Sequence, residues 1–117
     1  MSVFEGTVNG PVLGPEIQSG NGFFRLHDGG LDWSIKRPLR KELAGTVPWS
    51  DVTRIQVGVQ QVGSARAMAA FVSYGPLASG PGAGHLALQA TFTPRNVERF
   101  DALDDEFKRL APHAQLD

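Results

Sequence analysis

The sequence predicts an α+β fold that is mainly β, in which one C-terminal helix packs on an antiparallel sheet. Most of the chain alternates apolar and polar residues with a period of two, as half-buried strands do. The period changes to three and four only at residues 93–112, which indicates one amphipathic helix. The helix and the sheet must cover each other, because neither apolar face is stable in water.

Length and composition limit the class of protein. The 117 residues predict one domain, 1–117, with an N-terminal strand and turn segment at 1–20, strands over 21–92 and a helix over 93–112. Because 11 Lys and Arg balance 12 Asp and Glu, no overall field attracts nucleic acid or an anionic bilayer. The lack of cysteine excludes disulfides and thiolate chemistry. The start "MSVFEGTVNGPVLGPE" has neither a basic segment nor a long apolar run, so we expect a soluble cytoplasmic protein.

The N-terminal segment carries apolar residues ahead of the first hairpin, at Val3, Phe4 and Val8. Two arrangements are open. The segment packs on a neighbouring copy of the chain in a twofold contact, or it folds back as an extra strand of its own sheet.

The stretch "FFRLHDGGLDWSIK" predicts a β-hairpin. Phe24 and Leu26 share one face, and the Asp-Gly-Gly sequence at 28–30 supplies the positive φ that a tight turn needs. The return strand alternates again, with Leu31, Trp33 and Ile35 on the apolar side. The polar stretch "RPLRKELAG", residues 37–45, is predicted to be a connection.

The stretch "TVPWSDVTRIQV" predicts a short strand, a corner and a longer strand. Pro48 cannot donate to a β-ladder, so it belongs at an edge or a bend of the sheet. Trp49 is predicted to fill the corner as a wedge, and Ser50 and Asp51 to turn the chain. The longer strand then directs three residues inward: Ile55, Val57 and Val59.

Two further strands are predicted at 66–74 and 85–92, joined by a Gly/Pro-rich loop. The later strand alternates cleanly, with four residues inward: Leu86, Leu88, Ala90 and Phe92. The earlier strand is apolar on both sides, with Met68, Ala70 and Val72 opposite Ala67, Ala69 and Phe71. We therefore expect a partner subunit or the N-terminal segment to cover its outer face.

The helix has a clear beginning and end. Thr93 is a good N-cap, and Pro94 fits the first helical position. Two acid-before-base pairs, Asp104 with Lys108 and Asp105 with Arg109, are predicted on the wet side, and Pro112 ends the helix. The apolar stripe consists of Val97, Phe100, Leu103, Phe107 and Leu110.

Three features together resemble a bacterial pleckstrin-homology-like (PH-like) domain: "GFFRLHDGGLDW", the "VPWSDVTRIQV" corner and the single C-terminal helix. The resemblance covers residues 20–112 and implies a bent antiparallel sheet, or partly open barrel, of about seven strands capped by the helix. It also implies a mostly non-enzymatic role in binding lipid headgroups, peptides or other protein domains. The phosphoinositide-binding branch places several cations around its first hairpin loop, whereas this loop is "HDGG" with only Arg25 before it.

Few side chains are arranged for chemistry. The basic cluster Lys36, Arg37, Arg40 and Lys41 could hold a phosphate or an acidic peptide, and a solvated loop is the alternative. The stretch "SGPGAG", residues 79–84, leads into a strand and not into a helix, so it does not predict a phosphate loop. The histidines His27, His85 and His113 lack metal-ligand spacing.

We therefore predict a non-catalytic binding or assembly module that acts through protein–protein contact with a protein partner or with itself, as a possible homodimer. The alternative is a weak binder of anionic lipid headgroups or phosphate through Lys36, Arg37, Arg40 and Lys41. No catalytic residue, metal or cofactor is expected. Nucleic acid is not expected as a partner, because no basic stripe with interleaved aromatic residues is present.

Overall fold

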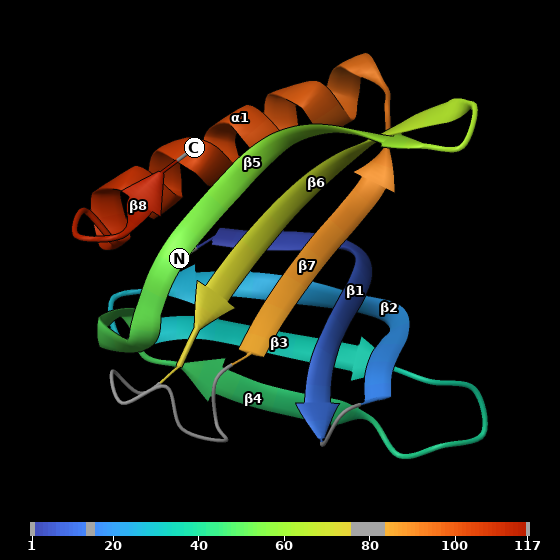
Figure 1. Cartoon of the computed structure of the whole chain (residues 1–117), viewed down its shortest axis with the longest axis horizontal. Helices are drawn as coiled ribbons and strands as arrows, with labels where there is room; N and C mark the ends of the chain where they lie inside the picture. The colour runs from blue at the N-terminus through green and yellow to red at the C-terminus, as the bar shows by residue number, and fades with distance from the viewer. Residues whose placement is uncertain (1, 14–15, 76–83, 117) are drawn as a thin grey trace.

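The computed structural model describes residues 2–13, 16–75 and 84–116 as one strongly bent, unclosed sheet with a C-terminal helix (Figure 1). The strand order is β4-β3-β2-β1-β7-β6-β5-β8, and every neighbouring pair is antiparallel except the short parallel pair β5-β8. This confirms the predicted fold class. In chain order the elements are β1 (Ser2–Leu13), β2 (Glu16–His27), β3 (Gly30–Lys36), β4 (Leu43–Val47), the 3-10 turn η1 (Trp49–Asp51), β5 (Val52–Val62), β6 (Ala65–Tyr74), β7 (Gly84–Thr91), α1 (Pro94–Leu110) and β8 (Gln115–Leu116).

The sheet bends along β1 and β2, so that β2, β3 and β4 run across β5, β6 and β7 (Figure 1). The bend requires close backbone approach. A Cβ atom at Gly22 would collide with the carbonyl oxygen of Ser34 on β3, so glycine is needed there. The helix α1 packs against β5, β6 and β1 and so covers the inner face of the sheet.

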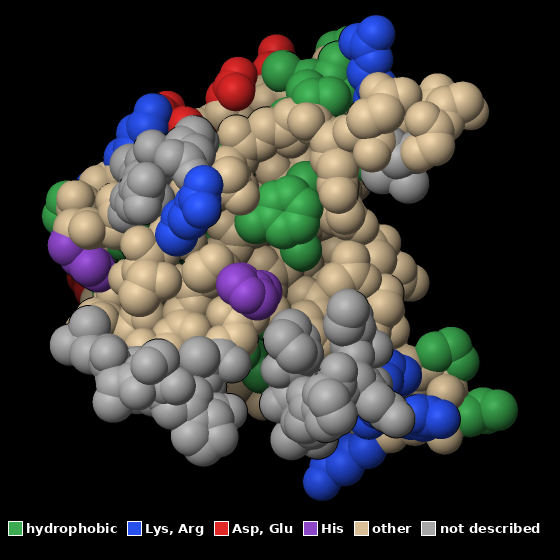
Figure 2. Space-filling view, in the orientation of Figure 1, with side chains coloured by type: hydrophobic (Ala, Val, Ile, Leu, Met, Phe, Trp, Pro, Cys, Tyr) green, Lys and Arg blue, Asp and Glu red, His purple; other side chains and the backbone are tan. Residues whose placement is uncertain are grey.

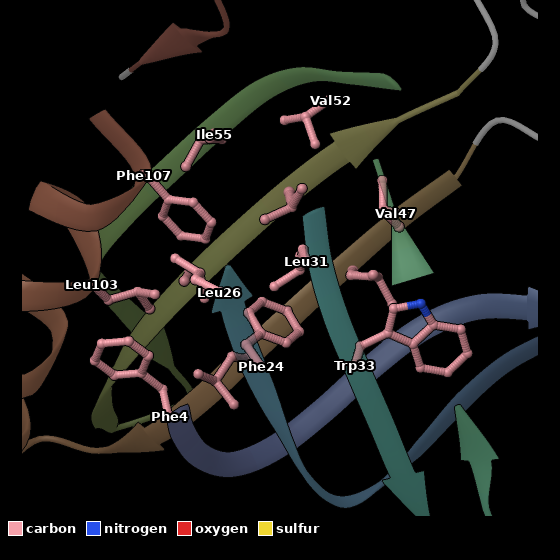
Figure 3. Packing of buried hydrophobic residues seen from close by; sticks show 14 of the residues in the cluster. Phe4, Phe24, Leu26, Leu31, Trp33, Val47, Val52, Ile55, Leu103 and Phe107 are labelled. Carbon is pink, nitrogen blue, oxygen red and sulfur yellow. The ribbon is translucent and has the colours of Figure 1, made fainter. Parts of the chain in front are cut away.

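The core forms from the inward residues of the sheet and the apolar stripe of α1 (Figure 3). Phe24 and Leu26 on β2 are fully buried, and they pair with Trp33 and Leu31 across the predicted hairpin. Figure 3 shows Phe107 directed from the helix toward Ile55 and Leu26. The hairpin is therefore confirmed, both in its turn and in the face that it buries.

The N-terminal segment is a strand of its own sheet. β1 pairs with β2 along most of its length and with β7 through residues 7–9. Phe4 and Val8 are buried in the core, whereas Val3 points outward and is exposed. Of the two arrangements that the sequence left open for this segment, the structure shows the internal one, and β1 does not lie over the outer face of β6.

The corner after β4 has the predicted shape, but the expectation that the Ser50 and Asp51 side chains close it by bonds to their own backbone was wrong, because a backbone bond closes the turn. The turn η1 is closed by the Asp51 N–H, which donates to the Pro48 carbonyl at 2.9 Å. Trp49 is only 7% exposed, and its Nε1–H donates to the His27 carbonyl at 2.6 Å. Its ring also meets the edge of Phe107 with centroids 6.1 Å apart and planes at 84°. Trp49 therefore joins the hairpin turn, the corner and the helix.

Three expectations were wrong in detail. The connection after β3 ends at residue 42, because Leu43 already pairs with Ile35 in the ladder of β3 and β4. Val59 and Phe92 were predicted to point into the core, but they are 56% and 44% exposed. The hairpin of β5 and β6, which carries Val59, extends beyond the helix in Figure 1. Phe92 follows the end of β7, where Arg66 lies 5.8 Å from the centroid of its ring. The predicted loop residues 79–83 lie outside the described residues.

The helix begins and ends as predicted. The Thr93 hydroxyl accepts from the Asn96 N–H at 3.1 Å, and α1 ends at Leu110, before Pro112. Within the described chain, no helix is long and apolar enough to cross a membrane. The apolar stripe is buried at Phe100, Leu103 and Phe107 and partly buried at Val97 and Leu110.

Of the two predicted ion pairs on α1, only one is present. Lys108 pairs with Asp104 at 3.1 Å. The pair of Asp105 with Arg109 was wrong, because Arg109 instead contacts Glu106 at 2.6 Å. A residue three positions away is as close on a helix surface as one four positions away, so the choice between two carboxylates is made by side-chain geometry.

We predict that Trp49→Ala lowers the free energy of unfolding by roughly 3–5 kcal/mol, the range for emptying a large buried aromatic site. Pro48→Ala is the matched control and should have little effect, because Pro48 is exposed and donates no ladder bond. Chemical denaturation of both variants measures the difference. A Trp49→Ala variant within about 1 kcal/mol of the parent would show that the corner does not depend on the indole.

Candidate protein-binding face

The outer face of β1, β7, β6 and β5 is uncharged over its whole centre. Phe71 lies in the middle of this face, half-buried, opposite Ala87 on β7 and Gln56 on β5. Figure 2 shows a hydrophobic group at the centre of this face, with mostly polar side chains and backbone around it and one Lys or Arg and one His side chain nearby. We call this surface the outer face; its central residues are Thr7, Asn9, Gln56, Gly58, Gln60, Ala67, Ala69, Phe71, Ser73, Ala87 and Gln89.

The alanines of β6 are covered in part by glutamines of the same chain. Gln89 on β7 donates to Gln60 on β5 at 2.6 Å, and the two side chains therefore meet across β6. The Asn9 side-chain amide on β1 donates to the Gln89 side-chain oxygen, Oε1, at 3.1 Å. Ala69, which pairs with Gln89 in the ladder, is consequently only 1% exposed. The cover expected for this face is thus supplied partly by amide side chains, which leaves Phe71 as its apolar centre.

A hollow of about 290 Å³ lies beside Phe71 on the outer face. Its floor is Gly58, where an added Cβ would meet no atom within 4 Å. The walls are Gln56, Gln60 and Phe71 itself. A half-buried ring at the border of an open hollow is a shape that a second protein surface can match.

The three histidines are dispersed and each has its own partner. His27 contacts Asp32, His85 contacts the Ser73 hydroxyl at 3.0 Å, and His113 contacts the Val52 carbonyl at 3.2 Å. Among the described residues, no carboxylate holds the His85 ring, so the Ser73 pair lacks the third group that orients a catalytic base. The described chain also contains no cluster of His, Asp and Glu that could hold a metal ion.

The four predicted cations lie together at the end of β3 and in the loop 37–42 that follows it. The Arg37 guanidinium donates to the Lys41 carbonyl at 2.8 Å and thereby closes the loop on itself. Leu39 stands at the loop's tip, 106% exposed and with φ of 56°. Figure 2 shows Lys and Arg side chains around exposed hydrophobic ones at the lower right. Sequence reasoning missed Leu39, although an apolar residue between cations in "RPLRK" was a visible signal.

A polar network on the outside of β2, β3 and β4 was also missed. Asp32 accepts from Arg25 at 2.6 and 2.9 Å, from His27 at 3.0 Å and from Thr46 at 2.6 Å. The His27 Nδ1 accepts from the Gly29 N–H at 3.1 Å, so its Nε2 carries the proton that faces Asp32. Arg25 and Thr46 both stand opposite Asp32 in their ladders, a pairing that only the register reveals.

The pKa of Asp32 results from opposed effects. Burial raises it, but hydrogen bonds from Thr46, His27 and Arg25 outweigh burial and lower the pKa from 3.8 to about 2. Because the partners come from β2 and β4 and Asp32 itself lies on β3, the carboxylate ties the three strands together. We assign this network a structural role.

Two larger hollows are weaker candidates for a binding site. One, of about 490 Å³, lies at the bend near Glu5, Phe23 and Lys36; the other, of about 530 Å³, lies beside Arg95 and Arg99 on α1. Arg99 is already bonded to the Glu5 carbonyl at 2.9 Å and to the Asn96 side chain at 2.8 Å. These hollows are therefore lined by polar groups, several of which have partners within the chain.

No protein-family model and no curated protein matches this chain. The site must therefore be judged from its own geometry.

We predict that Asp32 stabilises the fold above pH 4 and that this contribution is lost as the pH falls through about 2. A folded-state pKa below the unfolded value means that the unfolded chain binds the proton more tightly, so acid favours unfolding, here by roughly 2 kcal/mol. Denaturant titrations should show that the free energy of unfolding falls less between pH 5 and pH 2 for Asp32→Asn than for the parent. Asp28→Asn, in the exposed turn of the same hairpin, is the control and should behave like the parent. An equal loss in the parent and in Asp32→Asn would contradict the prediction.

Proposed function

We propose that the protein is a PH-like, non-catalytic assembly module and that the outer face is its protein-binding surface. The observation that carries the proposal is the uncharged face centred on Phe71, beside the hollow over Gly58. The centres of protein interfaces are depleted of charge and enriched in aromatic residues, and a ring that fills a pocket often dominates the binding energy. The strand order and the capping helix are compatible with a PH-like fold, whose members are mostly binding modules.

A second copy of the chain is the partner that this surface fits best. In a twofold contact the same patch meets itself, so each Phe71 can enter the hollow over Gly58 of the other copy. The side-chain amides of Gln56, Gln60 and Gln89 both donate and accept, so they can pair with their own kind. No like charges would face each other at the centre.

The area of the outer face sets the expected affinity of the dimer contact. Four strands about 4.8 Å apart and roughly 25 Å long present a footprint of roughly 500 Å². A standard interface buries about 800 Å² on each partner, so the contact belongs to the weak and reversible class. We therefore expect a monomer–dimer equilibrium in the micromolar range or weaker.

We predict that the mass measured by light scattering rises from that of the 12.6 kDa monomer toward twice that value as the protein is concentrated from about 10 μM to about 1 mM. Phe71→Ser should raise the protein concentration at the midpoint of dimerisation at least tenfold, because it removes the aromatic ring. Gly58→Gln should do the same by filling the hollow, and its Cβ atom would meet no other atom within 4 Å. Ala102→Gln, on the exposed side of α1, is the control. A monomer mass at every concentration would reject self-association through this face.

A second candidate function is weak binding of an anionic membrane surface through the basic loop. Leu39 is the observation that favours it, since a fully exposed apolar side chain between cations matches both the apolar and the charged part of a lipid interface. Against strong binding, the first hairpin loop presents one ion-paired arginine, Arg25, and no cluster of cations.

We predict little sedimentation with phosphatidylcholine vesicles that contain phosphoinositide at physiological salt, because few free cations contribute and each is screened. The informative variants are Leu39→Ser and the pair Arg40→Gln with Lys41→Gln, which spare the loop-closing Arg37 side chain. Lys108→Gln on α1 is the control for general charge. Tight binding that these loop variants abolish and Lys108→Gln leaves intact would make membrane binding the main function.

A further inference from the structure

β4, a strand of five residues, ends the strand order on one side, and its outer edge pairs with no strand in the described part of the chain. At the other end β5 is partly covered by β8 through Arg54 and Ile55. In Figure 1 β4 forms the lower border of the sheet. An unpaired edge presents backbone donors and acceptors that another strand can use.

The register shows which backbone groups face this edge. A two-residue turn joins β2 to β3, so its closing pair, His27 with Gly30, is a hydrogen-bonded pair. Hydrogen-bonded and non-bonded pairs alternate along an antiparallel ladder. Because this alternation continues from the ladder of β2 and β3 to the ladder of β3 and β4, the backbone N–H and C=O groups of Leu43, Gly45 and Val47 point toward β3. The N–H and C=O groups of Ala44 and Thr46 therefore point outward, away from the sheet.

Within the described residues, β4 is protected against strand addition by its shortness, five residues, but not by the composition of its edge. The sequence of β4 is LAGTV, without charge or proline, and its pairing with β3 runs without a bulge. Proteins commonly block edges by such devices. The exposed side chains of Ala44 and Thr46 are small, so they leave room for a neighbouring strand.

The charge around β4 is asymmetric and defines the kind of partner. Arg40 and Lys41 lie in the loop before the strand. Glu42, whose carboxylate accepts from the Ser34 hydroxyl, stands between them and Leu43, and the corner with Asp51 follows the strand. A segment that adds antiparallel to β4 places its C-terminal end beside the cations. A second copy paired in the same way would bring only Asp51 to each basic loop and would leave most of the positive charge unmatched.

We propose that the free edge of β4 binds an extended peptide segment by antiparallel strand addition, with carboxylates at the C-terminal end of the segment beside Arg40 and Lys41. Backbone bonds to Ala44 and Thr46 supply the affinity, and the cations set direction and preference for acidic ends. This surface is separate from the outer face, so the proposal is independent of self-association.

The test uses a fluorescein-labelled peptide of alternating threonine and valine that ends in two glutamates and a free carboxylate. Fluorescence anisotropy should show saturable binding to the full chain, and a peptide that ends in two lysines should bind at least tenfold more weakly. Ala44→Pro removes an outward N–H and no bond to β3, so it should weaken binding at least tenfold while the fold is retained. Ala44→Val, which keeps the N–H, is the matched control and should bind like the parent.

A second measurement does not depend on the proline variant folding. Amide hydrogen exchange of the parent protein should slow at least tenfold at Ala44 and Thr46 when the peptide saturates it, and not at residues of the outer face. No saturation up to 1 mM peptide would overturn the proposal, as would equal affinity for Ala44→Pro and Ala44→Val. Self-association that Ala44→Pro abolishes would overturn it in favour of pairing between two β4 strands.

Discussion

The contacts of Trp49 are the interaction on which the rest of the structure depends. At Trp49 the chain passes from β4, at one border of the sheet, to β5, at the other side. The indole contacts both the hairpin of β2 and β3 and the helix α1. Its N–H holds the turn of the β2–β3 hairpin, and its ring packs on Phe107 of the helix. Because hairpin, corner and helix meet at one side chain, the bend of the sheet and the position of its outer face are set together.

The local features of the fold could be predicted from the sequence, because they depend on neighbouring residues. The hairpin at 28–30, the corner at Pro48 and the cap at Thr93 each follow from turn or backbone chemistry within a few residues. The pairing of β1 with β7 and the exposure of Val59 could not be predicted. A period of two identifies the two faces of a strand, but whether a face is covered depends on how far a distant helix extends.

The same distinction holds for the candidate sites. The basic loop was found because its four cations fall within six residues of the chain, and Leu39 could have been included on the same grounds. The Asp32 network and the bond between Gln89 and Gln60 join residues on different strands, so only the register brings them together. The amides that span β6 also explain how a strand with alanine on its outward side can face solvent: the polar cover comes from the strands on either side.

The two proposed surfaces differ in the physical origin of their affinity, and the fold keeps them apart. The outer face lies on β1, β7, β6 and β5, has no charge at its centre and offers shape and apolar area, so its contacts should persist as salt increases. The edge of β4 lies at the opposite border of the sheet and combines backbone hydrogen bonds with the cations of the loop 37–42, so its contacts should weaken with salt. A weak dimer formed through the outer face would link two β4 edges without changing either edge. Two linked edges bind a partner that has two extended segments more tightly than one edge does. Weak contacts of both kinds are therefore compatible with a module that assembles at high local concentration and releases its partner when diluted.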